Sequence, residues 1–176
     1  DTYPSQSFFL YCQEMLERYR HDDRVWCIMG NNLMTEWEED ATDPSSYYFS
    51  AHGYGAYWGW AGWRRVWKKY DVKMDYWPEC KDKQLLDRHF LSKSEMSEVN
   101  HLFEGQFVGT IRSWDYQMDL ARILNRGVTC IPKVNLVQNI GFGAGGTHTV
   151  SEKDRRNKEE RGEIAFPLVH PKHMLV

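Results

Sequence analysis

The sequence predicts a mixed α/β fold with irregular aromatic loops, and three observations support that prediction. Apolar side chains recur at helical spacing from residue 8 to residue 19. A short apolar run at residues 25–29 is typical of a buried strand, and helical and strand-like patterns both return later in the chain. Of the 176 residues, 41% are hydrophobic and 15% aromatic, which supports a packed core and argues against disorder. At this length we expect one domain, or the larger part of one.

The first third of the chain predicts one helix and two strands. The helix is expected at residues 8–19, followed by a strand at 25–29 that Gly30 and two asparagines close. After an acidic loop and a turn signal at Pro44, residues 47–50 predict a second strand.

The segment from 53 to 70 has the most unusual composition, because seven large aromatic residues lie among four glycines. Residues 63–70 predict a short amphipathic helix with a basic outer face. Most of the rings are expected in the core, since large aromatics dominate buried area. Glycines beside tryptophans also leave concave, ring-lined surface that suits the apolar faces of sugars, so Trp58, Trp60 or Trp63 is a candidate ligand contact.

Pro78 is expected to end a third aromatic stretch, before two helices at 83–91 and 94–108. Either Ser92 or Ser94 is the predicted N-cap of the second helix.

The last predicted helix covers residues 115–125 and stops at Gly127, in the position C′. A strand at 128–131 and an extended run at 134–140 follow. Residues 151–163 are almost entirely charged and predict either a solvated helix or a flexible tail.

Charge, hydropathy and cysteine spacing exclude several classes. The net charge of −3 gives no electrostatic case for a nucleic-acid partner. No apolar run approaches the roughly 18 residues of a membrane helix, and no signal peptide is visible, so no integral membrane segment is expected. The four cysteines lack CxxC spacing, which argues against zinc; Cys12 and Cys27 are expected to be reduced core residues in a cytoplasmic protein.

Two constellations can carry chemistry. Asp115, beside Trp114 at the start of a helix, is either an N-cap or a general base that accepts a proton from a substrate hydroxyl. His148 ends a loop with four glycines in residues 141–146; the loop either brings backbone amides close to an anion or is simply mobile, and the imidazole is either a surface residue or a ligand of a metal or phosphate.

Four separated segments resemble, in order, segments of bacterial GT-A nucleotide-diphospho-sugar transferases. They are Phe8-Phe9, the stretch 58–65 (Trp-Gly-Trp-Ala-Gly-Trp-Arg-Arg), the stretch 114–117 (Trp-Asp-Tyr-Gln), and 139–149 (Asn-Ile-Gly-Phe-Gly to Thr-His-Thr). Residues 1–9 resemble the segment just after the acidic metal motif of that family. A more distant similarity, from Asp1 to about Thr149, is to the Golgi N-acetylglucosaminyltransferase that initiates complex N-glycans.

The resemblance implies the C-terminal, acceptor-side portion of a GT-A glycosyltransferase fold, a mixed sheet with flanking helices. It implies a domain at 1–150, with 151–176 as the charged helix or flexible tail. The Rossmann-like N-terminal half that holds the nucleotide base has no counterpart, so the chain is expected to begin at the metal motif and to be inactive alone.

The resemblance also implies roles for individual residues. Asp1 would bind a divalent cation, Mn²⁺ or Mg²⁺, on the donor diphosphate, and His148 would be a late ligand near it. Asp115 would be the catalytic base. Because the Golgi relative has two adjacent acids where this chain has Asp115-Tyr116, Asp119 is the reserve candidate.

Gly59 and Trp60 would lie between donor sugar and acceptor, and Trp114 and Gly143 would be further substrate contacts. The implied reaction is metal-dependent transfer of a sugar from a nucleotide-diphosphate donor to a carbohydrate or glycan hydroxyl, with inversion. The alternative is a non-catalytic carbohydrate-binding module, which explains the tryptophans and glycines without nucleotide or metal.

Overall fold

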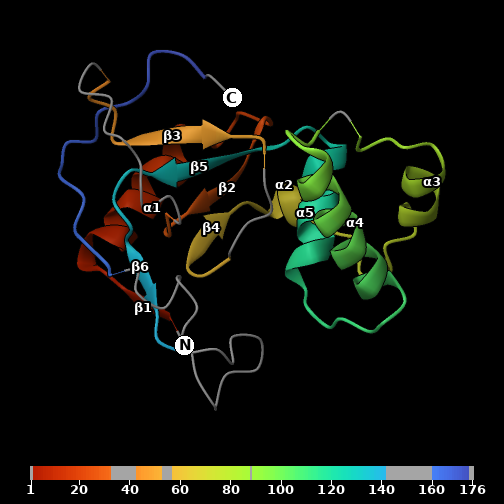
Figure 1. The fold of residues 1–176 in the computed structure, drawn as a ribbon. Helices are drawn as coiled ribbons and strands as arrows, with labels where there is room; N and C mark the ends of the chain where they lie inside the picture. Colours follow the sequence, from red (N-terminus) through yellow and green to blue (C-terminus); the bar gives the residue numbers. More distant parts are fainter. Residues whose placement is uncertain (1, 33–42, 53–56, 88, 142–159, 175–176) are drawn as a thin grey trace.

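The computed structural model describes residues 2–32, 43–52, 57–87, 89–141 and 160–174. Its strands gather on one side of the molecule and four of its helices on the other (Figure 1). The α/β fold, with a mixed sheet and flanking helices, is confirmed.

The larger sheet has four strands in the order β3-β5-β2-β4. The two inner strands, β2 (Val25–Met29) and β5 (Val128–Pro132), are parallel, whereas β3 (Tyr47–Ser50) and β4 (Trp60–Gly62) pair antiparallel with β5 and β2, respectively. All five residues of β2 are buried, as expected for a central strand covered on both faces.

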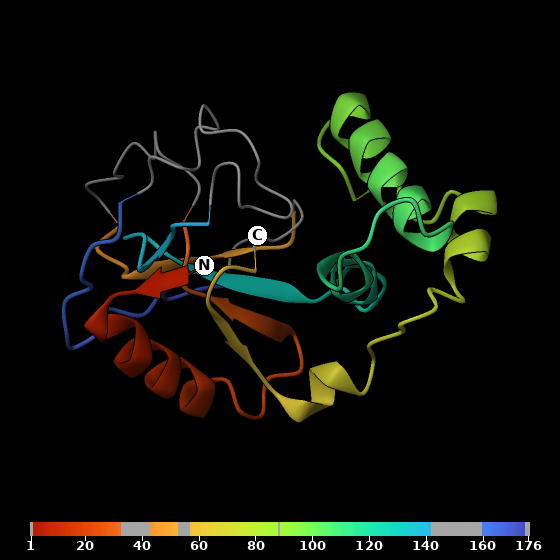
Figure 2. The ribbon, with the colours of Figure 1, turned by 90° about the horizontal axis from the view of Figure 1, so that it is seen from below.

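Helix α1 (Gln6–Arg18) covers one face of this sheet (Figure 2). It buries Phe8, Tyr11 and Met15 in the main core, together with Val25 and Ile28 of β2. The helix predicted at residues 8–19 is therefore confirmed, with both ends shifted by one or two residues.

A separate two-stranded sheet fastens the amino end of the chain to a segment far along it. Strand β1 (Thr2–Pro4) runs antiparallel to β6 (Val137–Asn139), with Thr2 opposite Asn139. The neighbouring residue Leu136 accepts a hydrogen bond from Ser5 N (2.8 Å) and donates one to Gly30 O (2.7 Å).

Helix α5 (Asp115–Leu124) joins the two sides of the molecule. Its Met118 and Ala121 share a core cluster with residues of β2. Its Leu120 and Ile123 face the other way, into a cluster with residues of α3 (Trp77–Asp82) and α4 (Lys93–Phe107). Helix α2 (Arg64–Trp67) adds Val66 to the first of these clusters.

The prediction of a helix at residues 83–91 is wrong. The helix in this region is α3, which ends at Asp82, and the described residues after it form turns. Pro78 lies in the first turn of α3, where its fixed φ and missing N–H suit a helix start, so it opens this helix instead of ending a stretch. Gln84 has a φ of +52° and Leu85 N donates to Cys80 O (3.0 Å), a Schellman turn that stops the helix.

The predicted role of Gly127 is also corrected. Arg126, with a φ of +54°, takes the left-handed C′ position after α5, and Gly127 is the next residue, donating to Arg122 O (2.8 Å). Glycine is needed there for space, because an added Cβ would lie 2.4 Å from the ring of Trp26.

Residues 160–174 contain no helix or strand and pack against the sheet side of the molecule. Ile164 and Leu168 are buried in the main core. Glu163 accepts hydrogen bonds from Gln6 N (3.3 Å) and Ser7 N (2.9 Å) and so caps α1 from the other end of the chain. This part of the range 151–176 therefore belongs to the packed domain, and residues 151–159 lie outside the described ones.

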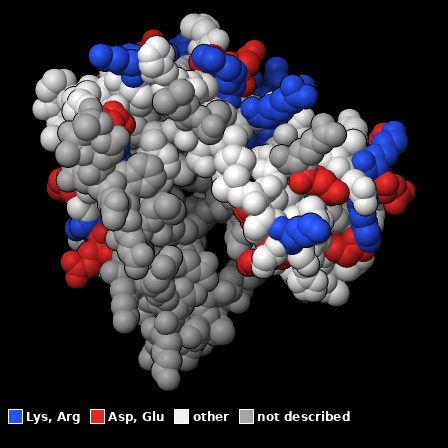
Figure 3. All heavy atoms as spheres, turned by 45° about the horizontal axis from the view of Figure 1, so that its top comes forward, with Lys and Arg blue, Asp and Glu red and all other residues white. Residues whose placement is uncertain are grey.

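All four cysteines are buried and free, which confirms the prediction of reduced core residues at Cys12 and Cys27. No helix in the described part of the chain combines the length and apolar composition needed to cross a membrane. Figure 3 shows acidic and basic side chains interspersed over the helical side of the molecule.

Candidate functional site

Asp115 is the first residue of α5, and the N-cap position belongs to Trp114, whose side chain makes no capping hydrogen bond. The N-cap interpretation of Asp115 is therefore not what the structure shows. Its Oδ1 instead accepts hydrogen bonds from Ser113 Oγ and Tyr116 N (3.1 Å). Among the described residues nothing donates to Oδ2, and the side chain is only partly buried.

The loop before Asp115 is held by helix α4. Gln106 Oε1 accepts a hydrogen bond from Ser113 N at 2.8 Å, and Ser113 in turn contacts the carboxylate. The Asp115 carboxylate is thus held through Oδ1, and Oδ2 has no donor among the described residues.

Five aromatic rings from three separate segments meet next to Asp115, and we call them the aromatic cluster: Tyr57, Trp60, Trp67, Tyr70 and Trp114. The ring of Trp114 stacks on Trp60 (centroids 5.8 Å apart, 24° between planes) and on Trp67 (6.0 Å, 29°). Tyr70 OH donates to Trp114 O (3.2 Å), so the cluster is tied to the start of α5.

The outer rings of the aromatic cluster are exposed. Trp67 is 46% exposed and Trp114 43%, whereas Tyr57 is 8% exposed. Trp60 is half-buried among the other rings, and its role as a substrate contact stays a prediction. The open apolar surface belongs to Trp67 and Trp114. The sequence analysis did not single out Trp67 and Tyr70 as site residues, because spacing in the sequence could not show that the end of α2 and the turn after it pack on Trp114.

Trp63 and Arg65 have structural roles. Trp63 Nε1 donates to Leu16 O (3.2 Å), and the Arg65 guanidinium lies 4.0 Å from the ring centroid of Trp63. Arg65 Nη2 also donates to Asp22 O (2.7 Å) and Val25 O (2.8 Å), so it points inward and not along a basic outer face.

Gly59 brings the aromatic segment against the two-stranded sheet. It has a φ of +69°, its carbonyl accepts a hydrogen bond from Gly30 N (2.9 Å), and an added Cβ would lie 2.7 Å from Val137. Any other residue would be strained in conformation and would collide with β6.

Asp119 is excluded as a base for a substrate. It is 1% exposed, and its Oδ1 accepts hydrogen bonds from Tyr57 OH (3.0 Å) and Arg122 Nε (3.3 Å). Arg122 is also buried and donates to Ala51 O (3.0 Å) and Gly127 O (3.3 Å). Burial, and then the charge of Asp119, raise the pKa of Tyr57 well above its ordinary value. This buried network joins α5 to the sheet, and a solvent-borne hydroxyl has no access to it.

Burial and the nearby Asp115 carboxylate, in that order, also raise the pKa of Tyr70. Tyr70 therefore remains a neutral hydrogen-bond donor at physiological pH, consistent with its bond to Trp114 O.

The predicted metal and loop residues Asp1, Gly143 and His148 lie outside the described residues. The described residues contain no group of three or more His, Cys, Asp or Glu side chains that could hold a metal ion. The β1–β6 pairing does place Thr2, which follows Asp1, opposite Asn139, which precedes the glycine-rich loop. The two segments expected to supply cation ligands thus leave the same end of one small sheet.

Comparison of the chain with protein-family models, with curated proteins and with solved structures found no match.

Proposed function

We propose that this chain is the acceptor-side part of a GT-A glycosyltransferase, which moves a sugar from a nucleotide-diphosphate donor to a carbohydrate hydroxyl with inversion. The observation that carries the proposal is the position of Asp115. Its carboxylate is anchored through Oδ1 and lies beside the exposed rings of Trp67 and Trp114. A surface that can hold a sugar ring therefore adjoins a group that can take a proton.

Contacts among three of the four segments that carry the family resemblance, and with the strand that leads into the fourth, support the proposal. An added Cβ on Gly30 would meet both Phe8 and Val137, and one on Gly59 would meet Val137. The stretch that begins at Trp58 therefore contacts strand β6, which precedes the glycine-rich loop. The same stretch meets Trp114 through Trp60. Segments far apart in sequence are brought to one region, as a shared site requires.

The chemistry assigned to Asp115 is general-base catalysis. As the acceptor oxygen forms a bond to the anomeric carbon and the bond to the diphosphate breaks, Asp115 takes the acceptor proton, a contribution of about 10²–10⁴ in rate. The rings of Trp67 and Trp114 orient the sugar, and such positioning lowers the entropic part of the barrier. The need for Mn²⁺ or Mg²⁺ rests on the resemblance alone, and no step here depends on it.

The decisive experiment replaces Asp115 by Asn in the protein expressed from its complete gene. Asparagine keeps the shape and the acceptor oxygen but cannot take the proton, so kcat should fall by about 10²-fold or more while donor binding survives. Asp87→Asn, at an exposed position away from the aromatic cluster, is the matched control and should leave kcat unchanged. If transfer proceeds at the normal rate in Asp115→Asn, the base assignment is wrong.

The second candidate is a carbohydrate-binding module, favoured by the exposed Trp67 and Trp114 rings. A module of this kind binds sugars without transfer, and Asp115→Asn leaves its affinity intact. Measuring sugar binding and sugar transfer on the same variants separates the two candidates.

A tryptophan pair tests the sugar platform in both cases. Trp67→Ala removes a ring that is 46% exposed and should weaken sugar binding by about tenfold, with a smaller fall in the melting temperature than Trp60→Ala. Trp60→Ala removes a ring packed on Tyr57, Trp67 and Trp114 and should lower the melting temperature. Sugar binding that is unaffected in Trp67→Ala counts against the platform.

A further inference from the structure

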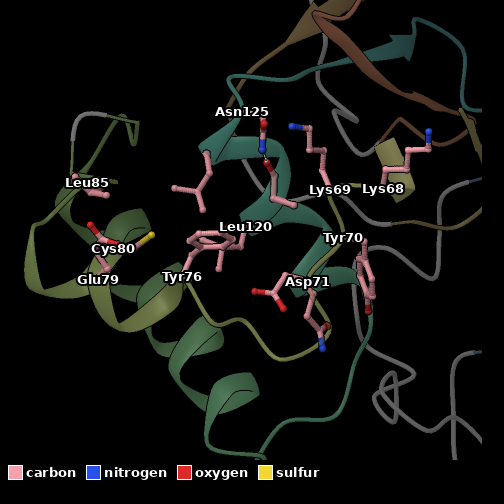
Figure 4. A pocket seen from close by; sticks show the side chains of 13 residues that line it. Lys68, Lys69, Tyr70, Asp71, Tyr76, Glu79, Cys80, Leu85, Leu120 and Asn125 are labelled. Carbon is pink, nitrogen blue, oxygen red and sulfur yellow. Dashed lines mark hydrogen bonds between the residues drawn. The ribbon is translucent and has the colours of Figure 1, made fainter. Parts of the chain in front are cut away.

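A cavity of about 660 Å³ opens between α3 and α5, and Tyr70 lines it (Figure 4). This volume falls within the roughly 300–1,000 Å³ of small-molecule sites. Its walls include the rings of Tyr70 and Tyr76, the side chains of Leu120 and Asn125, and two adjacent lysines, Lys68 and Lys69.

The net charge at the cavity is positive, because it is lined by two lysines and by one carboxylate that has no cationic partner among the described residues, that of Asp71. Asp71 keeps its negative charge, and its two oxygens accept hydrogen bonds from Lys73 N (3.0 Å) and Asp75 N (2.6 Å). Glu79 is paired with Lys83 at 2.6 Å. Within the described residues, neither Lys68 nor Lys69 has a hydrogen-bond or ion-pair partner for its ammonium group, so the site favours an anion.

The two lysines differ in direction. In Figure 4 the side chain of Lys69 extends toward Asn125, whereas the side chain of Lys68 points away from Asn125 and from Lys69. Asn125 Nδ2 donates to Ala121 O (2.8 Å), which leaves its Oδ1 as an acceptor for a hydroxyl group. Tyr76 is 63% exposed and lies beside Leu120, so a ring face and an apolar wall complete the site.

The cavity adjoins the proposed reaction site. Tyr70 lines the cavity, and its hydroxyl donates to the carbonyl of Trp114, the residue before Asp115. A ligand bound in the cavity would therefore contact Tyr70, which belongs to the aromatic cluster.

We propose that this cavity binds an acidic sugar unit of the acceptor, with its carboxylate or phosphate paired with Lys69, its ring against Tyr76 and a hydroxyl on Asn125. That the bound sugar is part of an acceptor rests on the proposed function. That the cavity binds an acidic sugar does not. An acidic sugar matches the combination of an unpaired cation, an aromatic face and an amide better than a neutral sugar does.

The binding test uses three probes that share a ring: glucuronate, glucose 6-phosphate and glucose, titrated by ligand-observed NMR. At least one acidic probe should bind about tenfold more tightly than glucose, and the better of the two identifies carboxylate or phosphate as the preferred anion. Lys69→Ala should remove that preference, whereas the matched variant Lys68→Ala, with the same change in charge, should keep it. Both residues are exposed, so melting temperatures should be unchanged.

Tyr76→Ala adds a test of the ring contact. It should weaken binding of the acidic sugar but leave any binding of inorganic phosphate unchanged. Equal losses in Lys68→Ala and Lys69→Ala, equal affinity for glucose, or no binding of either acidic probe would each overturn the proposal.

A transfer assay separates this inference from the proposed function. With the protein expressed from its complete gene, Lys69→Ala should raise the KM for an acceptor that contains a uronic acid and leave the KM for its neutral analogue unchanged. If glucuronate binds in a way that depends on Lys69 but no sugar is transferred, the proposed function is wrong and the proposed binding site stands. Transfer without such binding would overturn the site and keep the function.

Discussion

At the scale of single residues, two aspartates one helical turn apart have opposite environments. Asp115 lies at the open start of α5 with one oxygen engaged, whereas Asp119 is enclosed by Tyr57 and Arg122. The family resemblance ranked Asp115 ahead of Asp119 as the base, but the sequence offered no physical reason, because the difference in environment comes from the sheet that packs against only one side of α5.

Asp119→Asn should therefore destabilise the fold, not act on catalysis directly. The substitution removes the carboxylate of the buried ion pair with Arg122, and breaking a buried pair costs about 3–5 kcal/mol. Urea denaturation would measure the free energy of unfolding, with Asp115→Asn as the control that stays near the wild-type value. A wild-type midpoint for Asp119→Asn would contradict the assigned structural role.

His89 should make stability depend on pH. Burial, followed by the charges of Arg122 and His52, lowers its pKa from 6.5 to about 4. His89 therefore takes up a proton near pH 6.5 in the unfolded chain but only near pH 4 in the folded protein. The free energy of unfolding has its full value above pH 6.5 and falls as the pH drops toward 4. Because the side chain is only half-buried, we expect a loss of about 1–2 kcal/mol.

Urea midpoints at several pH values between 4 and 7 would measure this loss. His89→Gln should flatten the dependence, and His101→Gln, at an exposed position on α4, should leave it as in the wild type. An unchanged slope in His89→Gln would show that another group is responsible.

At the scale of elements, the apolar periodicity was a good guide wherever a helix or strand packs on one face. It predicted α1, α4, α5 and strands β2, β3 and β5 to within a few residues. It misplaced α3, since Pro78 is compatible with both a stop and a first turn and only tertiary packing of Trp77 and Cys80 decides between them.

The start of α4 gives a matched pair of variants. Ser92 is the N-cap, because its hydroxyl accepts a hydrogen bond from Glu95 N (3.1 Å), while Glu95 Oε2 accepts one from Leu91 N (3.0 Å). Ser92→Ala should cost about 0.5–2 kcal/mol of stability. Ser94→Ala, two residues into the helix, should have almost no effect or be slightly stabilising. Equal thermal shifts in the two variants would refute this assignment.

At the scale of the whole molecule, the site depends on contacts that no local pattern encodes. The meeting of Gly59 with Val137, and of Trp60 with Trp114, joins segments dozens of residues apart. The residues 160–174 illustrate the same limit: their sequence has no helical or strand-like periodicity, yet Ile164 and Leu168 complete the main core. Sequence analysis could name the segments that meet, but not the surfaces through which they do so.

Leu168→Ala should therefore destabilise the whole domain by about 2–5 kcal/mol, as expected for a truncated core leucine. Val169→Ala is the control, since Val169 is 44% exposed and its loss should change stability by no more than about 0.5 kcal/mol. A single cooperative transition, shifted only in Leu168→Ala, is the expected result of thermal unfolding followed by circular dichroism. Unfolding of residues 160–174 alone, without a shift of the main transition, would show that they are an appendage.

The cap that Glu163 places on α1, together with the pairing of Thr2 with Asn139, has a consequence for biosynthesis. Helix α1 therefore lacks the hydrogen bonds that its first turn donates to Glu163 until more than 150 further residues have been made. Both contacts close a long stretch of chain, and contacts of such large sequence separation slow folding. Nascent chains of this protein should accordingly be unusually dependent on chaperones that shield early hydrophobic segments.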